Sequence, residues 1–214
     1  MIRGDSVIEI DKVSVAIGDV TLLPEVSARA KKGSALILRG RNGTGKSTLL
    51  RVLAGTQQPT SGTARVAGGL VDDRSAAFRR AVASMVGLPP LAHDLTLVDH
   101  LTLVASTWTA DAAAATRTAR AVLDELGLAA LAERFPHELS SGQTQLFGLA
   151  LTLARPFEVL LLDEPEQRLD ADHITAVAEA LLARIEAGAT IVVATHSAQL
   201  TDALAGPVLS LDAA

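Results

Sequence analysis

The stretch Gly40-Arg41-Asn42-Gly43-Thr44-Gly45-Lys46-Ser47-Thr48 decides the fold of this chain. It follows the short apolar run 35–38 and precedes the helix-like run 49–54, so the order is strand, glycine loop and helix. Glycines allow backbone conformations that a side chain would block, and successive N–H groups can then turn inward around a phosphate. The start of the helix adds free N–H groups and the positive end of its dipole. This order predicts a phosphate cradle.

Two residues at the end of this stretch add the chemistry of a nucleoside triphosphate site. Lys46 supplies a positive charge for the β- and γ-phosphates, and the Ser47 hydroxyl can ligate Mg²⁺. The alternative is a chance glycine turn before a helix, but two glycines, a lysine and a serine rarely fall at these fixed positions by chance. The expected nucleotide contacts are Gly40, Asn42, Gly43, Thr44, Gly45, Lys46, Ser47 and Thr48.

Composition limits the classes of protein to which the chain can belong. Its 214 residues suit one domain, or one domain with a subdomain, and an apolar fraction of 49% suffices for a core. The absence of cysteine excludes disulfides and thiolate metal sites. A net charge of −5 argues against non-specific nucleic-acid binding. The longest apolar runs are far shorter than the ~20 residues of a membrane helix, so we expect no direct membrane insertion.

The pattern of apolar residues predicts an α/β chain that is interrupted by a helical insertion. Strands are expected at 7–17, 20–30, 35–38, 63–67, 81–86, 159–162, 189–194 and 208–211. Helices are expected at 49–54, 74–80, 142–154, 172–187 and 198–204. The insertion comprises helices at 97–108, 112–126 and 128–134, and Asp111 is expected to cap the second of them.

Two acids follow the buried strand 159–162, at the edge of an α/β sheet where ligands bind. Asp163 can hold Mg²⁺, directly or through water. Glu164 can accept a proton from an attacking water, and such general-base help raises rates by roughly 10²–10⁴. An acidic turn after a strand is the plain alternative, but beside a phosphate cradle we favour catalysis.

A histidine occupies the same place after another strand. His196 follows the strand 189–194 and would stand at the same sheet edge, where it could bond the γ-phosphate and the attacking water. A lone histidine at a strand end is more often a surface residue, yet its neighbours favour a functional role. The remaining histidines, which lack metal-ligand spacing, are interpreted as surface or structural residues: His93, His100, His137 and His173.

The polar turn Leu139-Ser140-Ser141-Gly142-Gln143 opens the expected helix 142–154. Ser140 fits the N-cap of that helix. The same turn also fits a second anion site, because it offers a hydroxyl and free backbone N–H groups at a helix N-terminus. The residues alone leave both interpretations open.

Taken together, these motifs resemble the ATPase subunit of an ATP-binding cassette (ABC) transporter, over essentially the whole of 7–211. Stretch 40–48 resembles the Walker A loop, 160–165 the Walker B strand and 139–143 the family signature. Asp170 resembles the D-loop aspartate, and His196 the switch histidine. The resemblance implies a single domain over 1–214 with the P-loop NTPase fold of the ABC type: a mixed sheet core, an antiparallel β part and a helical subdomain at about 88–140.

The resemblance also implies partners and cofactors. Two such domains, as a homodimer or heterodimer, would bind ATP and Mg²⁺ head to tail. Ser140, Gly142 and Gln143 would then serve the ATP of the partner subunit. ATP hydrolysis would drive a separate multi-helix membrane permease, with the chain held at the cytoplasmic face of the membrane.

Three positions depart from the family pattern. Gly87 stands where the family's Q-loop glutamine is expected, which puts the turnover rate and the usual coupling in question. Ile17 stands where an aromatic residue usually stacks on adenine, so base contact would be apolar without stacking. Ser141 replaces the first glycine of the signature, which is a mild change. We expect hydrolysis, at a reduced rate.

Two other functions fit the motifs. A non-transport ABC ATPase acting on ribosomes or DNA is one, although such proteins usually carry two cassettes or a long coiled coil. A regulatory nucleotide-binding partner with weak catalysis is the other, and Gly87 and Ile17 motivate it. A haem-exporter ATPase of cytochrome maturation is a narrower form of the transporter hypothesis, suggested by the short chain.

Overall fold

A computed structural model describes residues 6–212; residues 1–5 and 213–214 of the expected domain lie outside the described part. The first sheet is antiparallel, with strand order β2-β1-β4-β5. Its strands are β1 (Ser6–Ile17), β2 (Val20–Lys31), β4 (Ser61–Val66) and β5 (Gly69–Leu70). Ile8 and Ile10 are buried while Glu9 between them is not, so the apolar alternation of β1 gives one core face, as predicted.

The second sheet is parallel, with strand order β6-β7-β8-β3-β9. Its strands are β3 (Ala35–Arg39), β6 (Val82–Met85), β7 (Val159–Asp163), β8 (Thr190–Ala194) and β9 (Val208–Ser210). β8 is buried along its whole length, and β3 and β7 are buried except at their last residue, because both faces of the sheet are covered. All carboxyl ends of these strands therefore meet at one edge.

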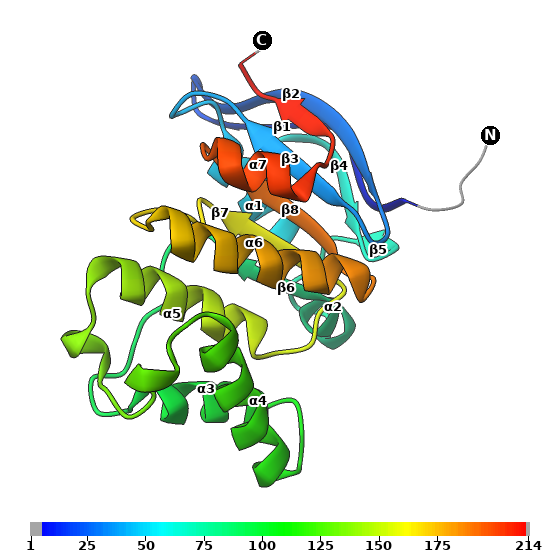
Figure 1. Ribbon diagram of the computed structural model, residues 1–214. Helices are drawn as coiled ribbons and strands as arrows, with labels where there is room; N and C mark the ends of the chain where they lie inside the picture. Colours follow the sequence, from blue (N-terminus) through cyan, green and yellow to red (C-terminus); the bar gives the residue numbers. More distant parts are fainter. Residues whose placement is uncertain (1–5, 213–214) are drawn as a thin grey trace.

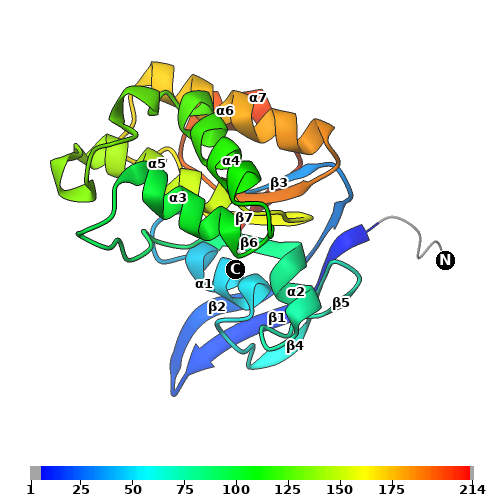
Figure 2. The same cartoon turned by 90° about the horizontal axis from the view of Figure 1, so that it is seen from below.

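Helix α1 (Lys46–Ala54) lies between the two sheets. Figure 2 shows α1 between the antiparallel sheet and the parallel sheet, with α6 and α7 beyond the latter. Leu49 and Leu53 of α1 are fully buried, and they share a core with Leu36 and Leu38 of β3. The helix that starts at the phosphate loop is thus fixed by packing on both sides.

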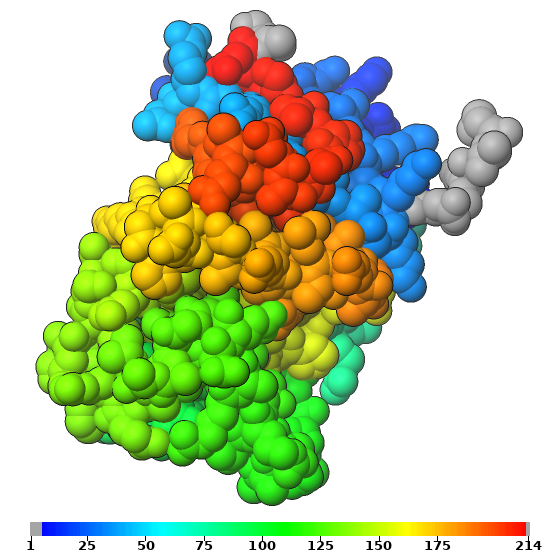
Figure 3. Space-filling view, viewed as in Figure 1, coloured from blue at the N-terminus to red at the C-terminus, as the bar shows by residue number. Residues whose placement is uncertain are grey.

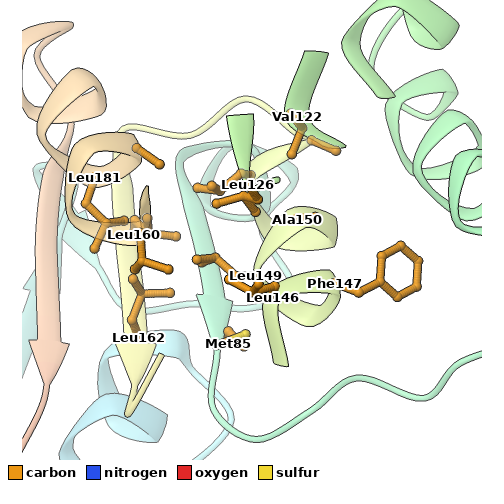
Figure 4. Packing of buried hydrophobic residues seen from close by; sticks show 14 of the residues in the cluster. Met85, Val122, Leu126, Leu146, Phe147, Leu149, Ala150, Leu160, Leu162 and Leu181 are labelled. Atoms are coloured by element: carbon orange, nitrogen blue, oxygen red, sulfur yellow. The ribbon is translucent and has the colours of Figure 1, made fainter. Parts of the chain in front are cut away.

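The opposite face of the parallel sheet is covered by α5 (Ser141–Leu153), α6 (Ala171–Glu186) and α7 (Ala198–Leu204). Figure 4 shows Leu160 and Leu162 of β7 in the same buried cluster as Leu146 and Leu149 of α5, with Met85 of β6 between them. Alternate residues of β3, β7 and β8 therefore enter different cores, which is why these three strands are mostly apolar in sequence.

The insertion forms a helical part at the bottom of Figures 1 and 3, built from α3 (Leu97–Ser106) and α4 (Ala112–Glu125). Asp111 caps α4 as predicted, accepting from the N–H groups of Ala113 and Ala114. The helix predicted at 128–134 is wrong: this segment contains only the 3-10 turn Ala129–Leu131. Gly127 turns the chain at φ +69°, and Pro136 disfavours helix at the residue before it.

A second short 3-10 turn (Pro136–Glu138) leads to α5, and α2 (Ala76–Ala81) precedes β6. Trp108, just after α3, joins the helical part to the rest of the chain. The guanidinium of Arg155 lies 4.4 Å from its ring centre and that of Arg80 lies 5.4 Å away.

Within residues 6–212, every helix falls short of the length and apolarity that crossing a membrane requires.

Replacing Leu126 with alanine tests how firmly α4 is packed. Leu126 is fully buried in the core that α5 and β7 share (Figure 4). We expect Leu126→Ala to lower the free energy of unfolding by about 2–5 kcal/mol in urea denaturation, since it leaves a cavity. The control Leu103→Ala on α3, where the side chain is 58% exposed, should change it by no more than about 0.5 kcal/mol. Equal effects of the two changes would contradict this packing.

Candidate active site

The phosphate loop connects the carboxyl end of β3 to the N-terminus of α1. Gly45 caps α1 with a left-handed backbone, φ +99°, and its carbonyl accepts the N–H of Leu49 at 2.8 Å. A Cβ at Gly45 would lie 2.7 Å from the carbonyl oxygen of Leu22 on β2. Glycine is therefore required here both by conformation and by the close approach of β2.

An open cavity of about 560 Å³ lies over this loop. It is lined from β2 by Val20, Thr21 and Leu22, from the far side by Glu164, and from the loop and α1 by Asn42, Gly43, Gly45, Lys46, Ser47 and Thr48. The other two predicted contacts shape the loop: the Gly40 carbonyl binds Lys46, and the Thr44 hydroxyl donates to the Arg41 carbonyl at 3.0 Å. The predicted nucleotide contacts thus belong to one loop.

Lys46 links the phosphate loop to the histidine that the sequence placed on another strand. Its side chain is buried, with 6% exposed, and Nζ donates to the Gly40 carbonyl at 2.6 Å. The same Nζ lies 3.2 Å from Nε2 of His196, and that Nε2 lies 3.3 Å from Oε1 of Glu164. The His196 ring accepts from Lys46 in one tautomer and donates to Glu164 in the other. Three predicted catalytic residues therefore meet at a single imidazole nitrogen.

The backbone of Glu164 is held in a strained conformation. Its φ is +49°, in the left-handed region that non-glycine residues seldom adopt. Its N–H donates to the Ala194 carbonyl of β8 at 2.8 Å, and its own carbonyl accepts from the Gln145 side chain at 3.0 Å. The Gln167 amide reaches the second carboxylate oxygen, Oε2, at 3.3 Å. Such strain persists only where surrounding contacts over-determine it, and this is typical of functional sites.

The predicted magnesium ligands are a hydroxyl and a carboxylate, which suit a hard cation. Ser47 lines the cavity, and Asp163 ends β7 opposite Ala194, one residue before Glu164. Within residues 6–212, no three histidine or acidic side chains gather as a metal cluster. Mg²⁺ commonly takes most of its oxygens from phosphates and water, so a hydroxyl and one carboxylate are compatible with this ion.

Ile17 lies at the tip of the β1–β2 hairpin, paired with Val20. Both side chains are open to solvent, 63% and 61% exposed, and Val20 lines the cavity. The hairpin therefore offers an aliphatic surface beside the phosphate loop, at the place where the sequence predicted contact with the base.

The signature residues lie at the start of α5, and among the described residues they do not line the cavity over the phosphate loop. Ser140 is the N-cap, as one of the two interpretations predicted: its hydroxyl accepts the N–H of Gln143 at 3.2 Å, and the Gln143 side chain accepts the N–H of Ser140 at 2.9 Å. A Cβ at Gly142 would lie 2.8 Å from the Arg168 carbonyl, so this glycine allows α5 to approach the loop after Glu164.

Asp170 caps α6 and contacts His173 twice. Its Oδ1 accepts the backbone N–H of His173 at 2.9 Å and lies 2.7 Å from the ring Nδ1. The backbone bond first and the ring contact second hold the pKa of Asp170 below its ordinary value. Among the other histidines, His100 is buried against Phe147 and is structural, as expected.

Three contacting residues were missed from the sequence: Gln145, Gln167 and Glu166. Glu166 is nearly buried, and its Oε1 accepts from the Thr195 hydroxyl and from the N–H groups of His196 and Ser197. A third acid so close to Glu164 was the available signal, but only the structure shows that it points inward. Nothing in the sequence indicates that Gln145, in the signature helix, contacts the segment that follows β7.

Comparison with known proteins identifies relatives of one kind. A family model described as "ABC transporter" matches residues 23–167. The chain is similar to the cytochrome c biogenesis ATP-binding export protein CcmA of Cereibacter sphaeroides, 35% identical over 87% of this chain and 81% of that protein. It is also similar to the glutamate/aspartate import ATP-binding protein GltL of Escherichia coli, 30% identical over 96% of this chain and 87% of that protein.

Solved structures give the same architecture. One, described as the ATP-binding subunit of an ABC transporter, superposes with a TM-score of 0.80 at 28% identity, over 92% of this chain and 82% of that one. Another, an ATP-binding cassette solved as a dimer in a post-hydrolysis state with ADP and Pi, has a TM-score of 0.83 at 24% identity over 96% of this chain and 94% of that one. The second likeness concerns the fold alone. The predicted fold class is confirmed by both.

Alanine substitutions at Gly43 and Gly45 distinguish the cost of a left-handed backbone from the cost of crowding against β2. Both have positive φ, +84° for Gly43 and +99° for Gly45, which costs an alanine about 1–2 kcal/mol. A Cβ at Gly43 would meet no described atom within 4 Å, whereas one at Gly45 meets the Leu22 carbonyl. We expect Gly45→Ala to lower the free energy of unfolding by about 1–3 kcal/mol more than Gly43→Ala, from the added crowding. Equal losses in urea denaturation would show that β2 does not press on the loop.

The stability that Asp170 contributes should depend on pH. Its pKa is depressed in the folded chain, so its contribution is present above the ordinary pKa of an aspartate and disappears as the pH falls through the folded value. We therefore expect Asp170→Ala to be less stable than the wild type at pH 7, and the difference to shrink in denaturation experiments below pH 4. A difference that stays constant down to pH 2 would argue that the carboxylate is not held by His173.

Proposed function

The chain belongs to the ABC transporter family, and we propose that it binds ATP in the cavity over the phosphate loop and hydrolyses it. The observation that carries this proposal is the meeting of Lys46, His196 and Glu164 within 3.3 Å at one edge of the parallel sheet. Each comes from a different strand end or helix start, and no two are neighbours in sequence. A structural role alone gives no reason for an ammonium, an imidazole and a carboxylate to converge beside an open cavity.

The chemistry follows from these groups. Glu164 takes a proton from a water molecule while the water oxygen bonds to the γ-phosphorus, and the bond from that phosphorus to the bridging oxygen of the β-phosphate breaks. The products are ADP and inorganic phosphate. Lys46 stabilises the negative charge on the β- and γ-phosphate oxygens, and loop N–H groups contribute in the same way. His196 lies between acid and ammonium, where it can position the water and the γ-phosphate.

Ser47 and Asp163 would hold Mg²⁺, which when bound neutralises charge on the phosphates. Both offer oxygen atoms at the same sheet edge as Glu164. The aliphatic pair Ile17 and Val20 would contact the base by apolar surface.

We assign the signature residues to a second subunit's nucleotide. Ser140, Gly142 and Gln143 lie outside the lining of this chain's own cavity, as far as the described residues go, and the Ser140 side chain is exposed at a helix N-terminus. In a head-to-tail dimer, whether of two copies or of two related chains, these residues and Asp170 would close the ATP site of the partner. A helix N-terminus favours a phosphate at that position.

We propose that ATP hydrolysis by this chain drives a separate multi-helix membrane permease. Of the relatives named above, one is called an export protein and another an import protein. An ATPase of the same kind in import and in export fits a chain whose separate permease selects the transported substrate. The chain would then work at the cytoplasmic face of the membrane.

One observation favours a second candidate, a nucleotide-binding partner with weak catalysis. At Gly87, where the family's Q-loop glutamine is expected, φ is +88° and no described atom lies within 4 Å of an added Cβ. Gly87 has no side chain to reach the site, and among the described residues none of 86–90 lines the cavity over the phosphate loop. In that case a related subunit would supply most of the hydrolysis.

Hydrolysis of MgATP by the purified chain tests both candidates. We expect Glu164→Gln to lower kcat by about 10²–10⁴ while ATP still binds, because only the general base is lost. Lys46→Ala should lose ATP affinity as well, since the phosphates lose their charged partner. His137→Ala, an exposed change on the surface, is the control and should leave both quantities unchanged.

Sedimentation of Glu164→Gln with and without MgATP supplies the second measurement. An ATP-dependent dimer that Ser140→Arg abolishes is the expected result. Wild-type turnover no faster than that of Glu164→Gln, alone and with the co-purified permease, would rule out the catalytic candidate in favour of the regulatory one.

A further inference from the structure

Glu166 is a charged side chain with no place in the mechanism above. It is 9% exposed and follows Glu164 and Pro165 in the loop after β7. Its Oε1 accepts the N–H of His196 at 3.0 Å and the N–H of Ser197 at 3.2 Å, in addition to the hydroxyl of Thr195. One oxygen of a buried carboxylate thus receives three hydrogen bonds from three successive residues.

The second oxygen makes this arrangement costly. Oε2 of Glu166 is buried and has no hydrogen-bond partner among residues 6–212. A buried polar atom without a partner opposes folding. An apolar side chain would remove that atom but leave the three donors without this acceptor, whereas an uncharged acceptor would serve them without burying a charge. Stability alone therefore does not explain a carboxylate here.

The position of Glu166 explains it better. The segment 164–166 is already fixed to β8 by the Glu164 N–H and to α5 by Gln145, whose amide donates to the carbonyls of Glu164 at 3.0 Å and Pro165 at 3.4 Å. Pro165 limits the backbone freedom between the two acids. Glu166 then joins this fixed segment to the loop that carries His196.

We propose that Glu166 is a positioning residue that sets the His196 backbone relative to Glu164. This inference rests on the proposed ATP hydrolysis. Without the tether, the loop 195–197 would keep its connection to β8 and the 3.4 Å bond from the Thr195 N–H to the Leu38 carbonyl of β3, but the His196 N–H would lose its acceptor. The 3.2 Å and 3.3 Å contacts of His196 Nε2 would then not be maintained. Small displacements of catalytic groups cause large losses of rate.

The test uses the full chain with two changes at this position. Glu166→Gln keeps an oxygen that can accept the three donors, whereas Glu166→Leu removes it at similar volume. We expect Glu166→Leu to lower kcat for MgATP by about 10- to 100-fold with KM changed by less than about threefold, and Glu166→Gln to stay within about fivefold of the wild type. The exposed change Glu179→Gln on α6 is the control and should have no effect.

A double-mutant cycle separates positioning from general damage. In a His196→Ala background, Glu166→Leu should lower kcat by less than about twofold, because the side chain it positions is gone. The same loss in both backgrounds, or no loss in either, would overturn the inference. If Glu166→Leu does not fold, Thr195→Val removes one of the three donors at nearly constant volume and should show the same dependence on His196.

Amide hydrogen exchange distinguishes failure of this inference from failure of the proposed function. In the nucleotide-free chain, the His196 N–H should exchange at least about 10-fold faster in Glu166→Leu and stay protected in Glu166→Gln. The Ser197 N–H also donates to the Thr195 hydroxyl at 3.0 Å, so its exchange should change less. If the wild type does not hydrolyse ATP but exchange behaves in this way, the proposed hydrolysis is wrong while the tether stands. Unchanged protection in Glu166→Leu would refute the tether itself.

Discussion

The register of three adjacent parallel strands determines whether this site forms at all. Leu38 of β3 pairs with Ala194 of β8, and Ala194 pairs with Asp163 of β7, so three strand ends are level at one edge. The phosphate loop, His196 and Glu164 each follow these paired strand ends by one or two residues. A slip of one residue would turn the strand's side chains to the opposite face and separate the Lys46–His196–Glu164 contacts. The two cores that cover the sheet prevent such a slip, because each strand buries alternate residues in both.

A second constraint connects the helical side of the chain to the same edge. Gln145 lies one turn after the signature residues on α5, and its buried side chain holds the carbonyl of Glu164. Gly142 allows the same helix to approach the Arg168 carbonyl. A shift of α5 would therefore displace the backbone of Glu164, the proposed general base. The strained φ of Glu164 gives that backbone a conformation that depends on these contacts.

Most of the site could be predicted from the sequence because its chemistry lies in short motifs after strongly apolar strands. The sequence predicts that Glu164 and His196 share one sheet edge and that Lys46 ends the phosphate loop, and the structure brings the three together. The long periodic segments were also predicted correctly, whereas the segment 128–134 was not, because Gly127 and Pro136 outweigh its helical spacing. Glu166 and Gln145 could not be predicted as contacts, since tertiary packing alone directs them inward. Sequence showed which residues were present but not which way they face.

The proposed hydrolysis requires that Lys46, His196 and Glu164 act together on one triphosphate. A crystal structure of the Glu164→Gln chain with MgATP tests this most directly. We expect the γ-phosphate to lie within hydrogen-bond distance of Lys46 Nζ and of the His196 ring, with Ser140 of a second copy on its other side. A structure in which Lys46 keeps its bond to the Gly40 carbonyl while the nucleotide binds elsewhere, or in which Ser140 faces open solvent in the nucleotide-loaded assembly, would contradict it.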